Sequence, residues 1–290
     1  MMKKYLYKME CITNMHVGNG DANYGLIDNE VQKDVVLTYV PAIYASGIKG
    51  ALREHFENLK ASDASDIEYI FGTEKKEGQY KFFGAKLLAR PLRVSASTDG
   101  SAYILTTSVD ILEDFSDFLS GMGLSNHYSY KADINFENVD TKFYCTSKAV
   151  QQIEGANVQQ IESAGEMQEG DESTGAIKTD KNQANPKLQK LLGEKIAIAE
   201  TLQDYPLPVI ARNKVKTEED PKGNLWYEEI VPHKSIFFFV VMVPEGENDF
   251  QTKFGDKIEG EAGPVQFGGN STIGQGYTVI TRMEGGGSDE

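Results

Sequence analysis

Cysteine is nearly absent from this sequence, which contains Cys11 and Cys145 alone among 290 residues. Two cysteines cannot form a disulfide framework, so the composition favours a reduced, cytoplasmic setting. Long hydrophobic runs are also missing. The longest, Ile236 to Val243, is far shorter than a bilayer span, and the first residues lack the apolar core of a signal peptide. We therefore expect a cytoplasmic protein with no membrane partner.

Positive charge is scarce as well. The chain has 29 lysines and arginines against 44 aspartates and glutamates, which gives a net charge of −15 and a pI of about 4.8. Nucleic-acid-binding domains are usually basic, so this balance argues against unspecific RNA or DNA binding. Six of the acids, however, lie between Gln151 and Ile177, a stretch with no lysine or arginine. A basic groove elsewhere is compatible with this distribution.

The rest of the composition is that of a globular protein. Hydrophobic residues make up 40% and charged residues 25% of the chain, whose length allows one large or two small domains. Between Thr146 and Pro186 the composition shifts to Gln, Glu, Gly, Ser and Asn, which predicts a polar, mobile insertion at residues 146–186. Residues 285–290 are typical of a flexible tail.

A long loop is the most unusual feature of the N-terminal part. It joins a strand ending near Thr13 to a helix beginning at Ser46, and at roughly thirty residues it exceeds the usual connection length, which indicates a functional loop or disorder. It contains His16 and Asp28 among glycines and asparagines. Its apolar residues predict that it packs against the protein and holds Asp28 in place. These residues are Leu26, Ile27, Val31, Val35, Val36 and Leu37.

The helix after this loop carries a candidate anion site. Ser46 is expected to be its N-cap, and apolar residues at three- and four-residue spacing predict one buried face. Lys49 and Arg53 follow in the first two turns, where free backbone N–H groups already favour an anion such as a phosphate. The alternative is that both are solvated cations, paired with Glu54 or Glu57.

The order of elements predicts an α+β fold of the ferredoxin type, since short strands lead into two helices. Ile236 to Val243 is apolar throughout and therefore predicts a central strand. Ser108 is expected to cap a second helix that Gly121 ends, and Ala61 to Glu77 is expected to be a polar connection. The other predicted strands are Tyr5–Thr13, Tyr80–Phe83, Ala85–Val94, Tyr103–Thr107 and Thr278–Arg282.

Two segments in the C-terminal half have the composition of RNA-contacting structures. Residues 208–231 form two extended runs around a polar loop, which predicts a β-hairpin whose basic face carries Arg212, Lys214 and Lys216; an ordinary solvated hairpin is the alternative. Gly268 to Gly276 contains four glycines, which expose backbone N–H groups as phosphate-binding nests do. A tight turn is the alternative there, because neither a Walker A motif nor a dinucleotide fingerprint is present.

Four stretches, in this order, resemble one known family. They are His16–Gly20 with Gly25–Asn29, Ser46–Arg53, Leu225–Glu229 with the preceding Arg212, and Gly268–Gly276. Together they resemble the Cmr-type backbone subunit of type III-B CRISPR effector complexes, which belongs to the repeat-associated mysterious protein (RAMP) superfamily. The resemblance covers residues 1–290 as a single RAMP domain, apart from the 146–186 insertion.

This resemblance implies a ferredoxin-like, RRM-related palm with a protruding β-hairpin thumb. It implies a filament of several copies along guide CRISPR RNA, bound to other Cmr subunits, in which complementary target RNA is cleaved at regular intervals. Asp28 matches the family's catalytic aspartate and Glu229 an acid of the thumb, so both are catalytic candidates. The expected RNA-binding residues are His16, Lys49, Arg53, Arg212, Lys214, Gly268, Gly269, Gly274, Gln275 and Gly276.

The chemistry expected of Asp28 is limited by the absence of close carboxylate pairs. The loop offers Asp21, Asp28, Glu30 and Asp34 but no Asp-x-Asp pair, whereas a two-metal nuclease needs several carboxylates. We therefore expect attack by a ribose 2′-hydroxyl, with Asp28 as base or as ligand of one Mg²⁺ or Mn²⁺, leaving a cyclic phosphate. Base pairing with the guide would select the sequence.

Several alternatives stay open at this point. Without the family match, Asp28 is more simply a side chain that caps its own loop, and His16 a packed polar residue. The chain could be a non-catalytic guide-binding filament subunit, a stand-alone RAMP endoribonuclease that processes precursor RNA, or an acidic ferredoxin-like enzyme of metabolism. A protease or esterase has no support, since neither a nucleophile elbow nor a zinc motif occurs.

Overall fold

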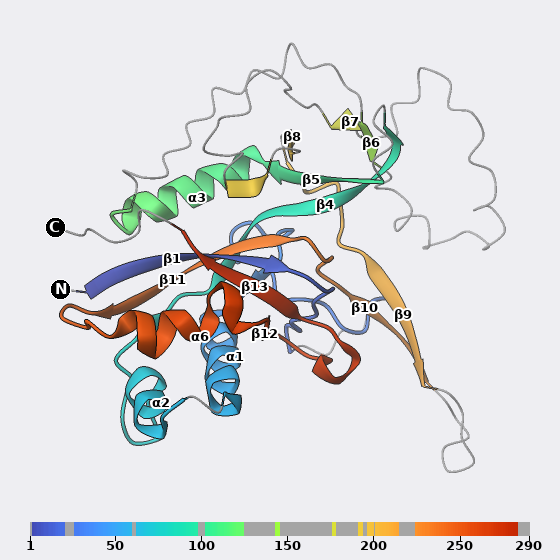
Figure 1. The fold of residues 1–290 in the computed structure, drawn as a ribbon. Helices are drawn as coiled ribbons and strands as arrows, with labels where there is room; N and C mark the ends of the chain where they lie inside the picture. The colour runs from blue at the N-terminus through green and yellow to red at the C-terminus, as the bar shows by residue number, and fades with distance from the viewer. Residues whose placement is uncertain are drawn as a thin grey trace, which may run out of the picture.

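A computed structural model describes most of the chain (Figure 1). The described residues are 2–20, 26–59, 62–97, 102–124, 143–145, 176–177, 191–193, 196–199, 201–214 and 224–283. The predicted insertion at 146–186, except for 176–177, and the predicted tail at 285–290 lie outside them. No helix in the described part is long and apolar enough to cross a membrane.

A mixed β-sheet forms the centre of the molecule. Its main path runs β12-β13-β1-β11-β4-β5-β8, and β11 (Ile236–Pro244) lies between β1 (Met2–Cys11) and β4 (Ala85–Ser97). The prediction that Ile236 to Val243 is a central strand is therefore confirmed. A run without polar residues suits this position, because both faces of the strand are covered.

The remaining strands extend the sheet on both sides. On one side are β13 (Tyr277–Arg282) and β12 (Val265–Gln266); on the other are β5 (Tyr103–Ser108) and β8 (Ile196–Ala199), which pair in parallel. All other pairings are antiparallel among the described strands. Four short strands pair off the main path: β2 (Ala42–Ile43), β3 (Lys81–Phe82), β6 (Phe143–Cys145) and β7 (Ala176–Ile177).

Helices pack on both faces of this sheet, which makes the fold α+β as predicted. One face carries α1 (Ala45–Asn58) and α2 (Ala64–Phe71) together with the short helices η4 (Gln251–Gly255), α6 (Asp256–Ile258) and η5 (Gly260–Ala262), while α3 (Val109–Gly121) covers part of the other (Figure 1). Alternation along β1 sends Tyr7 into the larger core cluster with α1, and Leu6 into a second cluster with α3.

Two predictions about helices are wrong, one on the start of α1 and one on the segment that contains α2. Ser46 is not the N-cap of α1, because the helix begins at Ala45 and the N-cap position is Tyr44, which makes no side-chain capping bond. The expected polar connection from Ala61 to Glu77 contains α2, whose N-cap Asp63 accepts a hydrogen bond from the Ser65 N–H. This helix was missed because it is short and its apolar residues come late in a polar segment.

A separate hairpin projects from the sheet. It consists of β9 (Val209–Lys214) and β10 (Asn224–Glu229), which pair antiparallel with Arg212 opposite Trp226. Figure 1 shows it extending away from the sheet at the end where β1 finishes and β11 begins. The hairpin predicted within 208–231 therefore stands beside the long N-terminal loop.

Candidate active site

Residues 14–44, called here the N-terminal loop, are joined to the base of the hairpin by backbone hydrogen bonds. Met15 and Val231 exchange N–H···O bonds of 2.9 and 2.8 Å. Further along, the N–H groups of Asp28 and Asn29 both donate to the Tyr227 carbonyl at 3.1 Å, and the Glu229 N–H donates to the Asn29 carbonyl at 2.9 Å. Residues 28–29 thus act as a short extra strand on the edge of β10.

Asp28 lies exposed on this extra strand. Its Oδ2 accepts the Tyr227 N–H at 2.7 Å, a bond between residues 199 positions apart. A side chain that merely capped its own loop would instead bond to a backbone group nearby in sequence. The hairpin therefore fixes one carboxylate oxygen of Asp28 while the side chain stays accessible to a ligand.

Glu228 connects the hairpin to two loops, although it was not among the site residues predicted from the sequence. The residue is only 5% exposed. Its carboxylate accepts bonds from Arg212 Nη1 and Trp226 Nε1, each at 2.8 Å, and longer ones from the side-chain nitrogens of Asn29 (3.5 Å) and Asn270 (3.4 Å). We call these five residues the Glu228 network. The one available sequence signal was strand register, which places Arg212, Trp226 and Glu228 on the same face of the hairpin.

The surroundings of Glu228 favour the charged form of its carboxylate. Burial alone would raise its pKa, but the hydrogen bonds from Arg212 and Trp226 outweigh burial and leave the pKa lowered. Arg212 also stacks its guanidinium 5.3 Å from the centre of the Trp226 ring. Arg212, predicted to bind RNA, is thus engaged within the protein, whereas Lys214 is exposed at the end of β9.

Glu229, the second catalytic candidate, points away from solvent. It is 5% exposed, and its Oε2 accepts the Val31 N–H at 3.2 Å and lies 3.3 Å from Lys33 Nζ. Burial raises its pKa, and Lys33 offsets only part of that effect. This arrangement suits a side chain that anchors the N-terminal loop.

His16 lies between the hairpin and the glycine-rich loop. Its Nδ1 is 2.8 Å from the Glu229 carbonyl, and its own carbonyl accepts the Gly269 N–H at 2.9 Å. Gly268 has a φ of +80°, and a Cβ built there would lie 2.3 Å from the His16 carbonyl oxygen, so the close approach requires glycine. The structure thus brings His16, the glycine-rich loop and the hairpin together.

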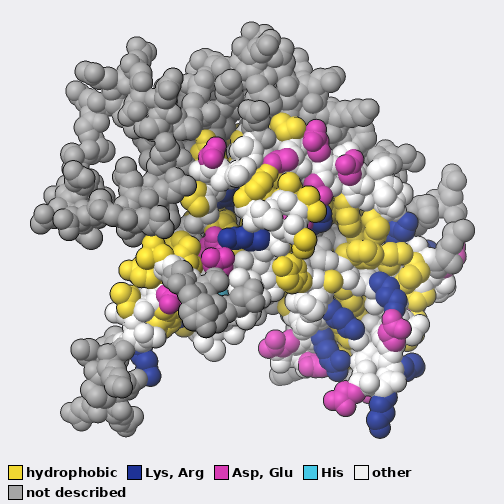
Figure 2. Space-filling model, turned by 180° about the vertical axis from the view of Figure 1, so that it is seen from behind, with side chains coloured by type: hydrophobic (Ala, Val, Ile, Leu, Met, Phe, Trp, Pro, Cys, Tyr) yellow, Lys and Arg dark blue, Asp and Glu magenta, His cyan; other side chains and the backbone are white. Residues whose placement is uncertain are grey.

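Lys49 and Arg53, two other predicted RNA-binding residues, lie on α1. Arg53 pairs with Glu57 at 2.7 Å and donates to the Gly72 carbonyl at 3.1 Å, so the paired alternative applies to it. Lys49 lies one turn before Arg53 on α1 and is half-buried. Figure 2 shows Lys and Arg side chains mixed with Asp and Glu at this end of the molecule, rather than a continuous basic stripe.

The expectation that the apolar residues of the N-terminal loop pack inward is only partly correct. Val31 is 2% exposed, but Val35 and Val36 are each 83% exposed. Asp34 explains this geometry, because its Oδ1 accepts the Val36 N–H at 2.8 Å and the Leu37 N–H at 3.0 Å and so forms a tight turn. Asp34 therefore has a structural role in the loop.

The donor groups around Asp28 limit how a metal ion could bind. The described residues contain no group of three or more His, Cys, Asp or Glu side chains able to hold a metal ion, and Asp21 lies outside them. Asp28 offers one carboxylate. This donor set does not suit a closed protein site, but it suits Mg²⁺, which commonly binds through one or two carboxylates with water and substrate phosphates as its other ligands.

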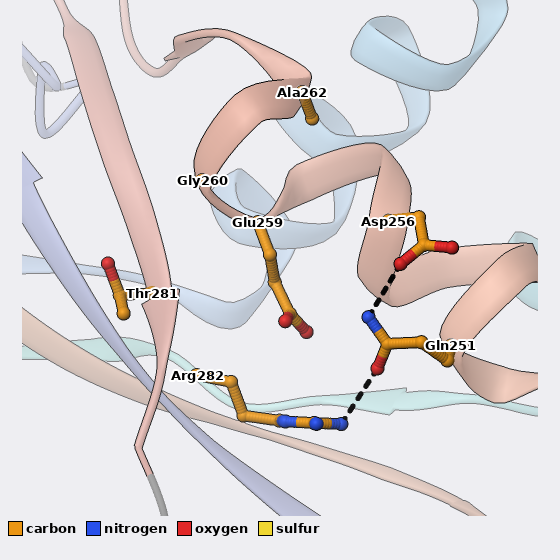
Figure 3. A pocket seen from close by; sticks show the side chains of 7 residues that line it. All are labelled: Gln251, Asp256, Glu259, Gly260, Ala262, Thr281 and Arg282. Atoms are coloured by element: carbon orange, nitrogen blue, oxygen red, sulfur yellow. Dashed lines mark hydrogen bonds between the residues drawn. The ribbon is translucent and has the colours of Figure 1, made fainter.

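A cavity of about 660 Å³ lies apart from these residues, between β13 and the helices η4 to η5 (Figure 3). Glu259 and Arg282 point into it from opposite sides. Arg282 donates to Gln251 at 2.9 Å, Gln251 to Asp256 at 2.7 Å, and Tyr7 to Glu259 at 3.1 Å. Its polar groups largely bond to one another, and none of the predicted site residues lines it.

Comparison with known proteins gives consistent results. The family model of the RAMP superfamily matches residues 8–279. The CRISPR system Cmr endoribonuclease Cmr4 of Pyrococcus furiosus is 25% identical over 297 residues, covering 98% of this chain and 97% of that protein. The CRISPR system CMR subunit Cmr4 of Saccharolobus solfataricus is 26% identical over 294 residues, covering 94% of each.

Solved structures share the same fold. The crystal structure of oligomeric Cmr4 from Pyrococcus furiosus aligns with a TM-score of 0.65 at 22% identity and covers 98% of this chain and 99% of that one. A chain in the cryo-EM structure of the type III-B Cmr-beta complex bound to cognate target RNA aligns with a TM-score of 0.63 at 19% identity and covers 96% of both chains.

Proposed function

Because the chain belongs to the RAMP superfamily, we propose that it is a Cmr-type backbone subunit, which stacks in several copies along guide RNA and cleaves the bound target RNA. Its partners are then guide CRISPR RNA, complementary target RNA, further copies of itself and the other subunits of a type III-B effector complex. The sheet with α1 and α3 corresponds to the ferredoxin-like palm, and the β9–β10 hairpin to the thumb.

The single observation that carries this proposal is the position of Asp28. Its exposed carboxylate is hydrogen-bonded to the base of the projecting hairpin, through Tyr227. A nucleotide displaced by the hairpin would therefore lie next to this carboxylate. The similarity to a protein named an endoribonuclease, and to a chain in a complex bound to target RNA, supports the same reading.

The cleavage step follows from one carboxylate acting on RNA. Asp28 removes the proton from a ribose 2′-hydroxyl, the 2′-oxygen attacks the adjacent phosphorus, and the bond to the 5′-oxygen breaks. The products are a 2′,3′-cyclic phosphate and a 5′-hydroxyl end, whose leaving oxygen takes a proton from water. Glu229, through Val31 and Lys33, and the Glu228 network, through Asn29, hold the loop in position for this step.

A divalent cation, Mg²⁺ or Mn²⁺, belongs to the proposal, and Asp28 would act either as the base, as written above, or as a ligand of this cation. When bound, the cation would stabilise negative charge on the phosphate. Its other ligands would come from water and RNA, since the described residues contain no group of three or more metal-binding side chains.

RNA contacts are proposed for the groups that surround Asp28. The glycine-rich loop, with Gly268, Gly269, Gly274, Gln275 and Gly276, is proposed to lie along the guide backbone, and Lys214 along the duplex beside the hairpin. The N–H groups of Gly269, Gly274, Gln275 and Gly276 donate to carbonyls of the protein itself, so the loop would admit the guide by its lack of side chains rather than through these four donors. His16 sets the distance between that loop and the hairpin. Lys49 would reach RNA only from the α1 side, and Arg53 is already paired with Glu57.

The test is cleavage by the assembled complex. It is loaded with a guide, given end-labelled complementary RNA and Mg²⁺, and compared with complexes that carry Asp28→Ala or Asp28→Asn. The asparagine can still accept the Tyr227 N–H, so it preserves the loop while removing the charge. Glu54→Ala, which removes an exposed acid on α1, is the matched control.

We expect evenly spaced fragments from the wild type and the control, and intact target bound by both Asp28 variants. Unchanged cleavage by Asp28→Asn would assign the chain to a non-catalytic guide-binding role. A single cut by the purified chain within a precursor RNA repeat would instead indicate a processing endoribonuclease. A protein that binds no RNA at all would favour an enzyme of metabolism.

A further inference from the structure

An exposed aromatic ring with cations around it lies at one end of the sheet, outside the site described above. Tyr103 at the start of β5 is 44% exposed, and Lys234 Nζ lies 5.5 Å from the centre of its ring. Arg93 on β4 is directly opposite Tyr103, so the two side chains share one face of the sheet. Ile12, 49% exposed, follows β1 beside Lys234. We call these four residues the Tyr103 patch.

Among the residues that the structure describes, the cations of the patch have no acidic partner. Arg93 is exposed and makes no hydrogen bond or ion pair with any of them, and the Lys234 ammonium group lies over the Tyr103 ring. By strand register, Glu10 lies opposite Ile236, two residues beyond Lys234. In a chain with a net charge of −15, two cations without an acidic partner in the described part of the chain, beside an exposed ring, form an uncommon local arrangement.

The backbone at Lys234 also points to a role for its side chain. Lys234 has a φ of +70°, a conformation that residues other than glycine rarely adopt. The turn is held by hydrogen bonds from the Lys234 N–H to the Cys11 carbonyl (2.6 Å) and from the His233 N–H to Asn14 Oδ1 (2.9 Å). Glycine would fit this turn with less strain, so the lysine charge over the ring is the feature that needs an explanation.

Asn14 links this patch to the proposed RNA path. Its side chain holds the turn at His233, and its carbonyl accepts the Gly276 N–H of the glycine-rich loop at 2.8 Å. The strand ends that carry the patch lie at the same end of the sheet as the hairpin (Figure 1). A strand of RNA on the glycine-rich loop could therefore continue over Tyr103.

We propose that the Tyr103 patch binds a single-stranded segment of RNA, with one base stacked on Tyr103 and the flanking phosphates held by Arg93 and Lys234. An aromatic platform between cations is the usual arrangement for unpaired nucleic acid, whose bases expose their flat faces. The assignment rests on the proposed function for the identity of the ligand. It adds a contact that neither the hairpin nor the glycine-rich loop provides.

The proposal is tested by binding, not by cleavage. Fluorescence anisotropy of a short fluorescein-labelled oligouridylate is measured with the full chain over a series of salt concentrations. Tyr103→Leu removes the ring and Tyr103→Phe keeps it. Lys234→Gly removes the charge and suits the positive φ, so it is expected to fold. Lys75→Ala, an exposed lysine on the turn after α2, is the matched control.

We expect Tyr103→Leu to weaken binding roughly tenfold, as loss of one stacked base does, while Tyr103→Phe stays close to wild type. Lys234→Gly should reduce the slope of log affinity against log salt by about 0.7, the value for one phosphate contact of a single strand. The control should change neither quantity. Ultraviolet crosslinking of the wild type should recover the peptide that contains Tyr103 joined to uridine.

Unchanged affinity for both Tyr103→Leu and Lys234→Gly, with wild-type circular dichroism, would overturn the proposal. A second way to overturn it uses labelled polyglutamate. If Tyr103→Leu weakens polyglutamate as much as oligouridylate, the patch is a docking site for an acidic protein segment and not for bases. Target cleavage by Asp28 is measured separately in the assembled complex, so the failure of one proposal can be distinguished from the failure of the other.

Discussion

Removing Glu228 is expected to unlock the candidate active site. In Glu228→Ala, Arg212, Trp226, Asn29 and Asn270 all lose their shared acceptor. Removing one partner of a buried ion pair costs about 3–5 kcal/mol. The Arg212 side chain is 23% exposed and can turn to solvent, so we expect a loss of about 2–4 kcal/mol in the free energy of unfolding.

Glu228→Gln separates the charge from the shape of this side chain. The amide oxygen can still accept from Trp226, while the ion pair with Arg212 is lost, for an expected cost of about 1–2 kcal/mol. Because the pKa of Glu228 is lowered in the folded state, its stabilising contribution is complete above the unfolded carboxyl pKa and is lost as the pH falls through the folded value. The difference between wild type and Glu228→Gln should therefore shrink on acidification.

Two assays measure these effects. Urea unfolding of the purified chain gives the stability change, and cleavage by the assembled complex gives the functional one. Since Asn29 adjoins Asp28, we expect Glu228→Ala to slow cleavage by roughly 10- to 100-fold at nearly unchanged target binding, as small misplacements of catalytic groups do. Glu30→Gln, which removes a half-exposed acid paired with Lys33 at 3.7 Å, is the control and should cost about 0–1 kcal/mol. Stability and cleavage of Glu228→Ala equal to those of the control would refute the reasoning.

Three further predictions follow from the same region. Gly268→Ala should lower the free energy of unfolding by about 2 kcal/mol or more, because the φ of +80° and the nearby His16 carbonyl oxygen exclude a Cβ. Gly269→Ala, whose Cβ would lie 3.9 Å from that oxygen, is the control and should be nearly neutral. Equal melting temperatures of the two variants would contradict this prediction. Burial raises the pKa of Glu229, so the fold holds its proton more tightly than the unfolded chain does. Stability is therefore lost as the pH rises from the unfolded carboxyl pKa through the folded one. Glu229→Gln should gain stability relative to wild type over that rise, and a constant difference across the pH series would argue against it. Chelation by EDTA should abolish target cleavage, and adding Mg²⁺ or Mn²⁺ should restore it. The melting temperature should not change, because the described residues hold no group of three metal-binding side chains. A lower melting temperature in EDTA would reveal a structural metal site.

The sequence predicted the elements whose pattern is local and strong. The apolar run of β11 identified a central strand, and the apolar stripes of α1 and α3 identified their buried faces, since Ile48, Leu52 and Phe56 are all buried. The ends of helices were harder to predict from the sequence. Ser46 is a residue type that often serves as an N-cap, but it is the second residue of α1. Capping depends on where the backbone turns, which residue type alone does not determine.

The candidate site was only partly accessible from sequence for a similar reason. The resemblance identified Asp28 and the hairpin, but the bond between Asp28 and Tyr227 joins segments 199 residues apart. The sequence pointed to Glu229, which anchors Val31 and Lys33. It did not point to the neighbouring Glu228, whose carboxylate accepts hydrogen bonds from four donors. The exposure of Val35 and Val36 was missed because the turn made by Asp34 outweighs their hydrophobicity.

The extra strand at residues 28–29 makes the hairpin and the Asp28 carboxylate one mechanical unit. Bonds from Asp28, Asn29 and Glu229 connect them directly, so a force that bends the hairpin also carries the carboxylate. A guide–target duplex that pushes the hairpin aside would thus also move the carboxylate. The interval between cleavage sites would be set by the spacing of neighbouring hairpins and not by the nucleotide sequence of the target.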